Sequence, residues 1–336
     1  MAENIEENIQ EEVTPDNMNE VESPEIEIEA SMDEEQEDQE PQMTDEQSEA
    51  VEFYQNLAET MDDRVLTSLA MELVADYKKD KESRSDWEKS YISGLDLLGF
   101  KYDNASGPFL GASSVTHPLL AEAVTQFQSQ AYKELLPSDG PVRTQVVGNS
   151  TEEREQQAER VKEFMNYMIM DQMEEYTPEF DQMLFYLPLA GSTFKKVYYD
   201  ELMDRAVSKF IPAEDLVVPY YATDLKDCER ITHVLKMSEN DILKKQRAGF
   251  YRDIDILPSR KDDSDIQDKY DQLEGSSNPS DTDYQFNVLE MHVDLDLEEF
   301  EMDSDEKNIK VPFIVTLDEG SREILSIYRN YDEDDE

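Results

Sequence analysis

The chain is poor in basic residues, and this shortage argues against one class of function. Its 336 residues include 30 lysines and arginines against 82 aspartates and glutamates, so the formal net charge at pH 7 is −52. A protein that grips DNA by its phosphates needs a basic surface, and this composition does not indicate one. We therefore do not expect the free chain to bind duplex DNA.

Cysteine and histidine are also scarce. Cys228 is the only cysteine, which excludes an intramolecular disulfide and a cysteine metal cluster. The histidines are His117, His233 and His292, and no two lie within five residues of each other or beside the cysteine. Metal-ligand spacing is therefore absent, and we expect each histidine at the surface or at the edge of the core.

Long apolar runs and catalytic loop motifs are missing too. No window approaches 18 apolar residues, so no membrane span is expected, and the N-terminus lacks the charged and apolar regions of a signal peptide. The glycine loop GPFLGASS (107–114) lacks the lysine and the spacing of a phosphate-binding loop, so we interpret it as a structural turn. No G-x-S-x-G motif is present to expose a serine nucleophile.

Residues 1–50 contain 20 acidic residues and no lysine or arginine. Such a segment buries too little apolar surface to offset its ordering entropy, and its like charges repel one another. We expect a disordered acidic tail that acts as a solubilising arm, with docking to a basic partner as the alternative.

Residues 51–190 show mainly helical patterns. Apolar spacing predicts helices within 59–99 and a helix over 118–136 whose buried face centres on Phe127. A Gly/Ser/Pro-rich loop is expected at 100–117 and a short strand at Val142–Val147. Ser150 and Glu153 form a possible capping box for a helix near 151–174, and Thr177 is expected to cap a helix that begins at Pro178.

From residue 191 the patterns are mainly extended. Strands are expected around Phe194–Tyr199, Val207–Phe210, Leu216–Val218, Asn287–Leu297, Val311–Leu317 and Glu323–Tyr328. One helix near 239–248, capped by Ser238, interrupts them, and the polar stretch 256–282 is expected to be an exposed insertion. Helices first and strands later, without regular alternation, predict an α+β fold with a β-rich region over 191–336.

Two acidic groups could bind metal. Asp263, Asp265, Gln267, Asp271 and Glu274 fit positions of a calcium loop, but Asp268 stands where the sharp turn needs glycine. The second group could serve a two-metal nuclease and comprises Asp294, Asp296, Glu298 and Glu299. Alternation of polar and apolar residues from Met291 to Asp296 is explained more simply by a strand with one solvated face. We assign no catalytic, cofactor-binding or metal-binding residue.

Three stretches resemble a known family. They are GPFLGASSVTHPLLAEAVTQFQSQAYKELLPSDGPVRTQVVG (107–148), the segment 178–236 and VLEMHVDLDL (288–297). Within the second stretch, LPLAGSTFKKVYYD, IPAEDLVVPYYATDL and RITHV are the most specific parts. Together they resemble the portal proteins of short-tailed (podovirus-type) bacteriophages, the ring-shaped gates through which the genome enters and leaves the capsid.

The resemblance implies a structural virion protein rather than an enzyme. Such portals are dodecameric rings at one capsid vertex that dock terminase and later the tail adaptor, associate with capsid and scaffolding proteins, and pass double-stranded DNA without reading its sequence. They need no cofactor, contact no membrane and assemble in the host cytoplasm. Full-length relatives are roughly twice as long, and their stem, clip and crown elements follow the region that resembles this chain. We therefore expect this chain to be the N-terminal, wing-rich part of a portal, either a truncated gene product or one piece of a split one.

Two other functions stay open at this point. An acidic adaptor or scaffolding module would bind basic capsid or motor proteins through residues 1–50. A metal-dependent nuclease would use the Asp294–Glu299 group. Ring formation would favour the portal, and loss of partner binding when residues 1–50 are deleted would favour the adaptor. Magnesium-dependent DNA cleavage would be needed for the nuclease.

Overall fold

The structure is a computed structural model that describes residues 53–98, 117–200, 203–256, 266, 269–270, 285–297 and 309–331. All of them belong to one compact unit that spans Glu46–Glu336. The acidic tail, most of the expected 100–117 loop and the calcium-type register lie outside the described residues.

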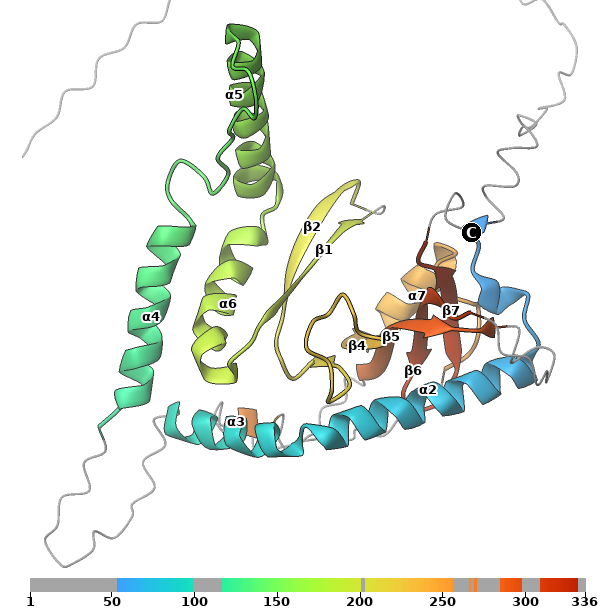
Figure 1. The fold of residues 1–336 in the computed structure, drawn as a ribbon. Coiled ribbons are helices and arrows are strands. Elements are labelled where there is room, and N and C mark those ends of the chain that lie inside the picture. The colour runs from blue at the N-terminus through green and yellow to red at the C-terminus, as the bar shows by residue number, and fades with distance from the viewer. Residues whose placement is uncertain are drawn as a thin grey trace, which may run out of the picture. The chain divides into compact units, whose positions relative to one another are not determined.

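Helices dominate the described part up to residue 190 (Figure 1). They are η1 (Leu57–Glu59), α2 (Asp63–Ser83), α3 (Ser85–Leu98), α4 (Leu119–Leu135), α5 (Glu152–Tyr167), the π-helix η2 (Met168–Gln172) and α6 (Tyr176–Ala190). None of the helices in the described ranges is both long and apolar enough to cross a membrane.

Strands follow from residue 194. β1 (Phe194–Asp200) and β2 (Arg205–Ile211) form a separate antiparallel hairpin. A five-stranded antiparallel sheet contains β3 (Leu216–Val217), β4 (Arg230–Ser238), β5 (Gln285–Leu295), β6 (Val311–Asp318) and β7 (Ile324–Arg329), with neighbours in chain order. The expected α+β fold, with helices first and strands later, is confirmed.

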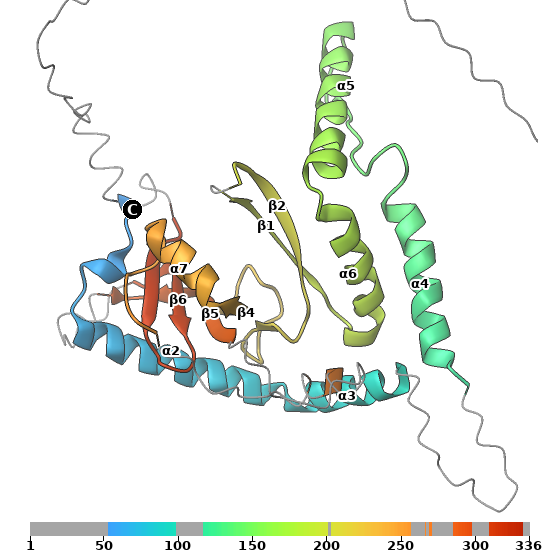
Figure 2. The same ribbon diagram turned by 180° about the vertical axis from the view of Figure 1, so that it is seen from behind.

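Helix α2 covers one face of this sheet (Figures 1 and 2). Asp62 caps its first turn by accepting a hydrogen bond from the Arg64 N–H, and its inward stripe consists of Leu66, Leu69, Leu73 and Tyr77. These side chains pack against apolar residues that alternate along β5, namely Leu289, Met291, Val293 and Leu295. The helical and extended periods thus meet in one core.

The opposite face of the sheet is apolar at one end only. There α7 (Glu239–Arg247) places Ile242 against Phe286, Val288 and Met237. Ser238 caps this helix through a hydrogen bond from the Asp241 N–H, which confirms the expected cap. Farther along the same face, β5 carries Glu290 and His292 instead of apolar residues, so this end requires polar partners.

Two arginines fasten the sheet to the long helices. The Arg84 guanidinium donates to the carbonyl oxygens of Ala213, Glu214 and Leu216 at the start of β3. Arg230 in β4 forms ion pairs with Asp76 and Asp80 of α2, at 2.6 and 2.8 Å. Asp80 is buried, and its charge is tolerated there because the guanidinium lies against it.

Several local expectations were wrong. Thr151, not Ser150, caps α5, and α6 begins at Tyr176 with Thr177 already inside its first turn. Val142–Val147 contains no strand, since the Asn166 side chain, rather than a neighbouring strand, bonds the N–H and carbonyl oxygen of Val142. A strand needs a partner strand, and this segment lies beside a helix.

Two expectations about burial were also wrong, one for a segment expected to be exposed and one for a residue expected to be buried. Within the polar stretch 256–282, Ile266 is buried and Tyr270 packs against it in a cluster with Tyr91 and Leu95 of α3. Phe127 is 41 % exposed, whereas Val124 is 1 % exposed. The face of α4 that meets α6 is therefore rotated away from Phe127, because a helical period shows that a stripe exists and does not show where its partner lies.

Candidate functional site

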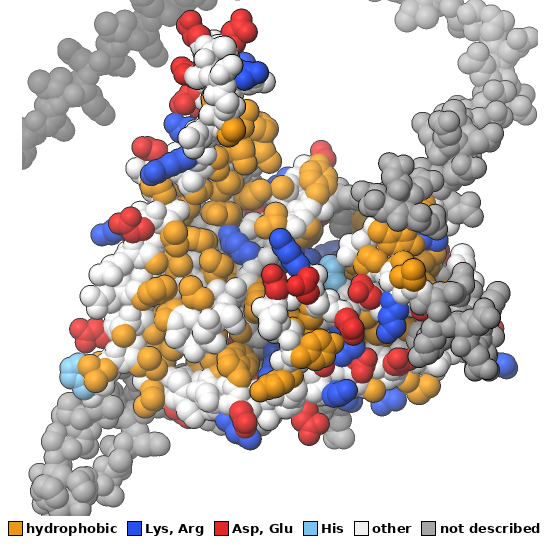
Figure 3. Space-filling view, viewed as in Figure 1, with side chains coloured by type: hydrophobic (Ala, Val, Ile, Leu, Met, Phe, Trp, Pro, Cys, Tyr) orange, Lys and Arg blue, Asp and Glu red, His pale blue; other side chains and the backbone are white. Residues whose placement is uncertain are grey.

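A concentrated group of ionisable side chains lies on the polar end of the sheet face that α7 shares with the hairpin. We call it the Glu290 cluster, and it comprises Lys196, Lys209, His233, Lys245, Glu290 and His292. The Lys196 ammonium is ion-paired with Glu290 Oε1, and His292 Nε2 lies 3.3 Å from the same oxygen. Near the middle of Figure 3, acidic, basic and histidine side chains lie close together among hydrophobic ones.

Strand register brings this cluster together. His233 of β4 lies directly opposite Glu290 of β5, and His292 is two residues farther along the same strand. In the hairpin, Lys196 of β1 lies directly opposite Lys209 of β2. Two like charges directly opposite each other destabilise a strand pair, so Glu290 offsets a repulsion that the hairpin carries.

Glu290 is the charge on which the cluster depends. Burial raises its pKa, but the hydrogen bond with His292 and the nearby Lys196 ammonium outweigh burial and hold the pKa at about 2. The carboxylate is therefore ionised at neutral pH. It joins the hairpin to the five-stranded sheet through its ion pair with Lys196.

The pKa values of two neighbouring bases are lowered as well, which for a base disfavours the charged form. Burial, Lys196 and His292 lower the pKa of His233 to about 4, so its imidazole is neutral at pH 7. Burial also lowers the pKa of Lys245, with Lys196 acting in the same direction and Glu290 opposing it. Each added positive charge at this place is disfavoured by those already present.

The histidine expectations are answered in part. His117 is exposed, while His233 and His292 are half-buried and share one sheet face. They are 59 positions apart in the sequence, so linear spacing could not reveal that they meet. Within the described ranges, no three histidine, cysteine or acidic side chains are arranged to hold a metal ion.

No protein-family model matches this chain, and no curated protein matches it either.

The acidic group considered for a nuclease is divided between two places. Burial and Glu229 raise the pKa of Asp294, whose N–H donates to the Glu229 carbonyl oxygen. Asp296 is buried and lines a hollow of about 520 Å³ together with Leu57, Met61 and Arg329. Glu298 and Glu299 lie outside the described residues. The expected solvated strand face is wrong for Asp296, which is buried.

A second charged contact fixes the hairpin to α6. Lys195 Nζ lies 3.5 Å from the centre of the Tyr176 ring and 5.2 Å from that of the Phe180 ring, which stacks on it, so the ammonium makes cation–π contacts with both. Burial lowers the pKa of this lysine, and Glu179 and Glu175 oppose that effect. The two adjacent lysines of β1 thus point to different neighbours, Lys195 to α6 and Lys196 to the sheet.

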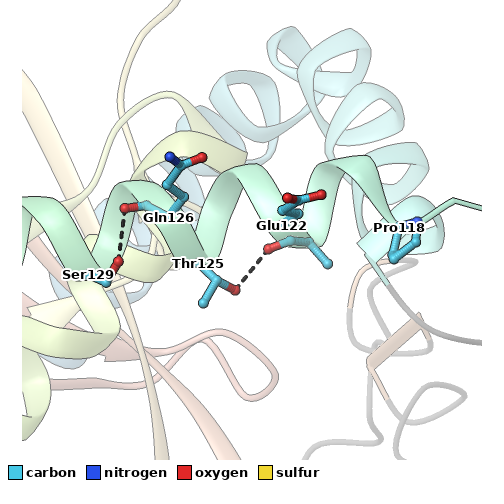
Figure 4. Close-up of a pocket in the computed structure, with 6 residues that line it drawn as sticks. Pro118, Glu122, Thr125, Gln126 and Ser129 are labelled. Atoms are coloured by element: carbon cyan, nitrogen blue, oxygen red, sulfur yellow. Dashed lines mark hydrogen bonds between the residues drawn. The ribbon is translucent and has the colours of Figure 1, made fainter.

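A shallow groove runs along the outer face of α4 (Figure 4). It is lined by Ala121, Glu122, Thr125, Gln126 and Ser129 of this helix and by Pro118, the residue just before it. The Thr125 and Ser129 hydroxyls donate to carbonyl oxygens of the preceding turn, so they are already engaged. The groove therefore offers small polar side chains and one carboxylate, and no nucleophile–base pair.

Exposed apolar side chains gather on α5. No residue of this helix is buried in the described part of the chain. Four of its apolar side chains are exposed, namely Val161, Phe164, Met165 and Tyr167, and Phe164 is 60 % exposed. Figure 3 shows hydrophobic side chains around the base of this helix, below the charged side chains of its far end. Apolar surface of this kind on a folded chain marks a place where another surface docks.

Sequence reasoning identified the histidines and the alternation along β5 and missed Lys196, Lys209, Lys245 and Glu290. The only local signal was the change on one face of β5 from Phe286 and Val288 to Glu290 and His292. The hairpin lysines join the cluster through tertiary contact, which no spacing in the chain encodes.

Proposed function

We propose that this chain is a structural subunit of a portal ring of a short-tailed bacteriophage. The sequence resemblance is the starting point. The two segments LPLAGSTFKKVYYD (187–200) and IPAEDLVVPYYATDL (211–225) follow one another through the end of α6, the hairpin and β3, so the resembling residues form one continuous part of the fold.

The observation that supports an assembly role best is the exposed apolar surface of α5. A helix with four exposed apolar residues and no buried one is poorly accounted for within a lone chain. In a ring it would be covered by the neighbouring subunit, as apolar surface is in stable interfaces. Such a ring would sit at a capsid vertex, bind terminase and the tail adaptor, and let double-stranded DNA pass.

The distribution of charge supports passage of DNA without adhesion. Several of the arginines are already engaged with carboxylates, as in the pairs Arg84–Glu88, Arg205–Glu175 and Arg230–Asp80. An acidic, internally paired surface gives phosphates little to bind. DNA would then be held by enclosure in the ring rather than by attraction.

The test is assembly of the full chain, observed by negative-stain microscopy and sedimentation, with Phe164→Ser as the variant. Because Phe164 is exposed, we expect the substitution to leave the thermal midpoint unchanged and to reduce ring formation. Leu243→Ser on α7, another exposed apolar residue, is the matched control and should leave rings intact. Rings that persist equally in both variants would remove the role given to α5.

The acidic adaptor remains the second candidate, supported by the 20 acidic residues and absence of basic ones in residues 1–50. It predicts a chain that forms no ring, binds a basic protein, and loses that binding when residues 1–50 are removed.

A further inference from the structure

The outer edge of β2 is closed by carboxylates from α6. Glu175 Oε1 accepts a hydrogen bond from the Ser208 N–H at 3.2 Å, and Glu179 Oε2 accepts one from the Phe210 N–H. The two glutamates are one helical turn apart and the two N–H groups are two strand residues apart, so the spacings match. This edge cannot accept a further strand without losing these bonds.

The outer edges of the five-stranded sheet are engaged as well. The Asn56 side chain donates to the Leu325 carbonyl oxygen and accepts from the Ile327 N–H, so it imitates a paired residue along β7. At the other edge β3 has only two residues, and Arg84 donates to the Leu216 carbonyl oxygen. Short or covered edge strands are how folded sheets avoid pairing with other chains.

The outer edge of β1 has no such protection in the described part of the chain. Hydrogen bonds to the main chain of Phe194–Tyr198 come from β2 alone among the described residues. The strand also exposes Val197 by 67 % and Tyr199 by 59 %, both on one face. An open edge with exposed β-favouring side chains is a template for another strand.

The sequence of this edge is complementary to itself. When Lys196–Asp200 lies antiparallel to the same segment of a second copy, Lys196 is opposite Asp200 of that copy. Val197 is then opposite Tyr199, and Tyr198 is opposite Tyr198. Lys196 is already ion-paired with Glu290, and Asp200 already accepts a hydrogen bond from the Met203 N–H. The pairs that stabilise this sheet are therefore the aromatic–β-branched and aromatic–aromatic ones, and no like charges lie directly opposite each other.

We propose that β1 is a docking edge for β1 of a second copy of this chain. Pairing joins two hairpins, each marginal as an isolated two-stranded unit, into one four-stranded antiparallel sheet. The contact is two-fold symmetric, so it differs from the head-to-tail contact between neighbours in a closed ring. It involves about five residues from each copy, and such a small interface gives weak, concentration-dependent association.

The experiment is sedimentation velocity of the full chain over rising concentration, with Val197→Lys as the main variant. Lysine on an exposed edge is a device by which native sheets prevent pairing, and the substitution removes two Val–Tyr contacts per dimer. We expect the dissociation constant to rise about tenfold or more. Val161→Lys, the same change at an exposed valine of α5, is the matched control and should leave two-fold association unchanged.

A second variant and a second measurement guard against a folding defect. Tyr198→Lys places two lysines directly opposite each other and should weaken association further, while circular dichroism reports the fold. Hydrogen exchange of residues 194–200 should slow as concentration rises in the natural chain and not in either variant. A chain that stays monomeric, or associates equally well with Val197→Lys, overturns the proposal. Rings that are insensitive to both substitutions would support the portal function and reject this edge.

Discussion

At the scale of single residues, a few basic side chains decide which carboxylates can be buried in a very acidic chain. Arg230 makes the burial of Asp80 possible, and Lys196 does the same for Glu290. The cost of desolvating these groups is offset because each charge has a partner and hydrogen bonds within reach. Burial, and after it the same crowding of positive charge, lowers the pKa of His233 and leaves it neutral.

His233 should make the stability of the chain depend on pH. A histidine in the unfolded chain titrates near pH 6.5, whereas His233 in the folded chain has a pKa of about 4. Between these values the unfolded chain binds the proton more strongly, so its free energy of unfolding falls as the pH is lowered. Burial disfavours the charged imidazole most, Lys196, Lys209 and His292 add to this effect, and Glu290 opposes it.

Denaturant unfolding at pH 6.5 and about 5 measures this effect. His233→Gln should reduce the loss of stability on acidification over that interval, where most carboxylates remain ionised. His117→Gln, at an exposed histidine, is the control and should behave as the natural chain does. Equal slopes in all three proteins would show that His233 is protonated in the folded state.

At the scale of elements, the periodic pattern of α4 predicts the helix correctly and predicts the wrong side of that helix to be buried. Its contact with α6 includes Gln128, whose side-chain amide donates to Asp181, and Val124 is buried one turn earlier on the same side of the helix. Ala131, Tyr132 and Leu136 continue the contact toward Phe180 and Leu184. Phe127 lies outside this line and is 41 % exposed.

Two alanine substitutions should therefore rank in an order opposite to the sequence expectation. Val124→Ala should lower the free energy of unfolding by about 2 kcal/mol, because it removes two buried methyl groups and leaves a cavity. Phe127→Ala should cost less than about 1 kcal/mol, since the ring keeps much of its exposure in the folded chain. Urea unfolding of both variants measures this. A larger loss for Phe127→Ala would place that ring in a core.

The sequence predicts elements whose signal is local and misses features that depend on a partner. The hairpin, β5 to β7 and the Ser238 cap of α7 follow from alternation and cap chemistry within a few residues. The absence of a strand at Val142–Val147 depends on Asn166, and the burial of Ile266 depends on α3. The Glu290 cluster depends on β4–β5 register and on hairpin docking, neither of which is encoded in adjacent positions.

At the scale of the whole molecule, net charge governs what can approach. The chain carries −52 in total, and removal of residues 1–50 leaves −32 on the other 286 residues, since that segment holds 20 acidic and no basic residues. Several basic side chains in the described part already face carboxylates. A polyanion therefore meets repulsion over most of the surface, and repulsion extends farther as salt is lowered.

This charge predicts that free duplex DNA does not bind, and that lowering the salt does not induce binding. DNA-binding proteins bind more tightly as salt falls because counterion release drives them. Here we expect no mobility shift at about 0.15 M salt and none at about 0.01 M, where the Debye length approaches 30 Å. The chain without residues 1–50 is the control and should also leave DNA unshifted, because the remainder is still acidic. A shift that strengthens at low salt would reveal a basic surface and would contradict the enclosure of DNA that the portal function requires.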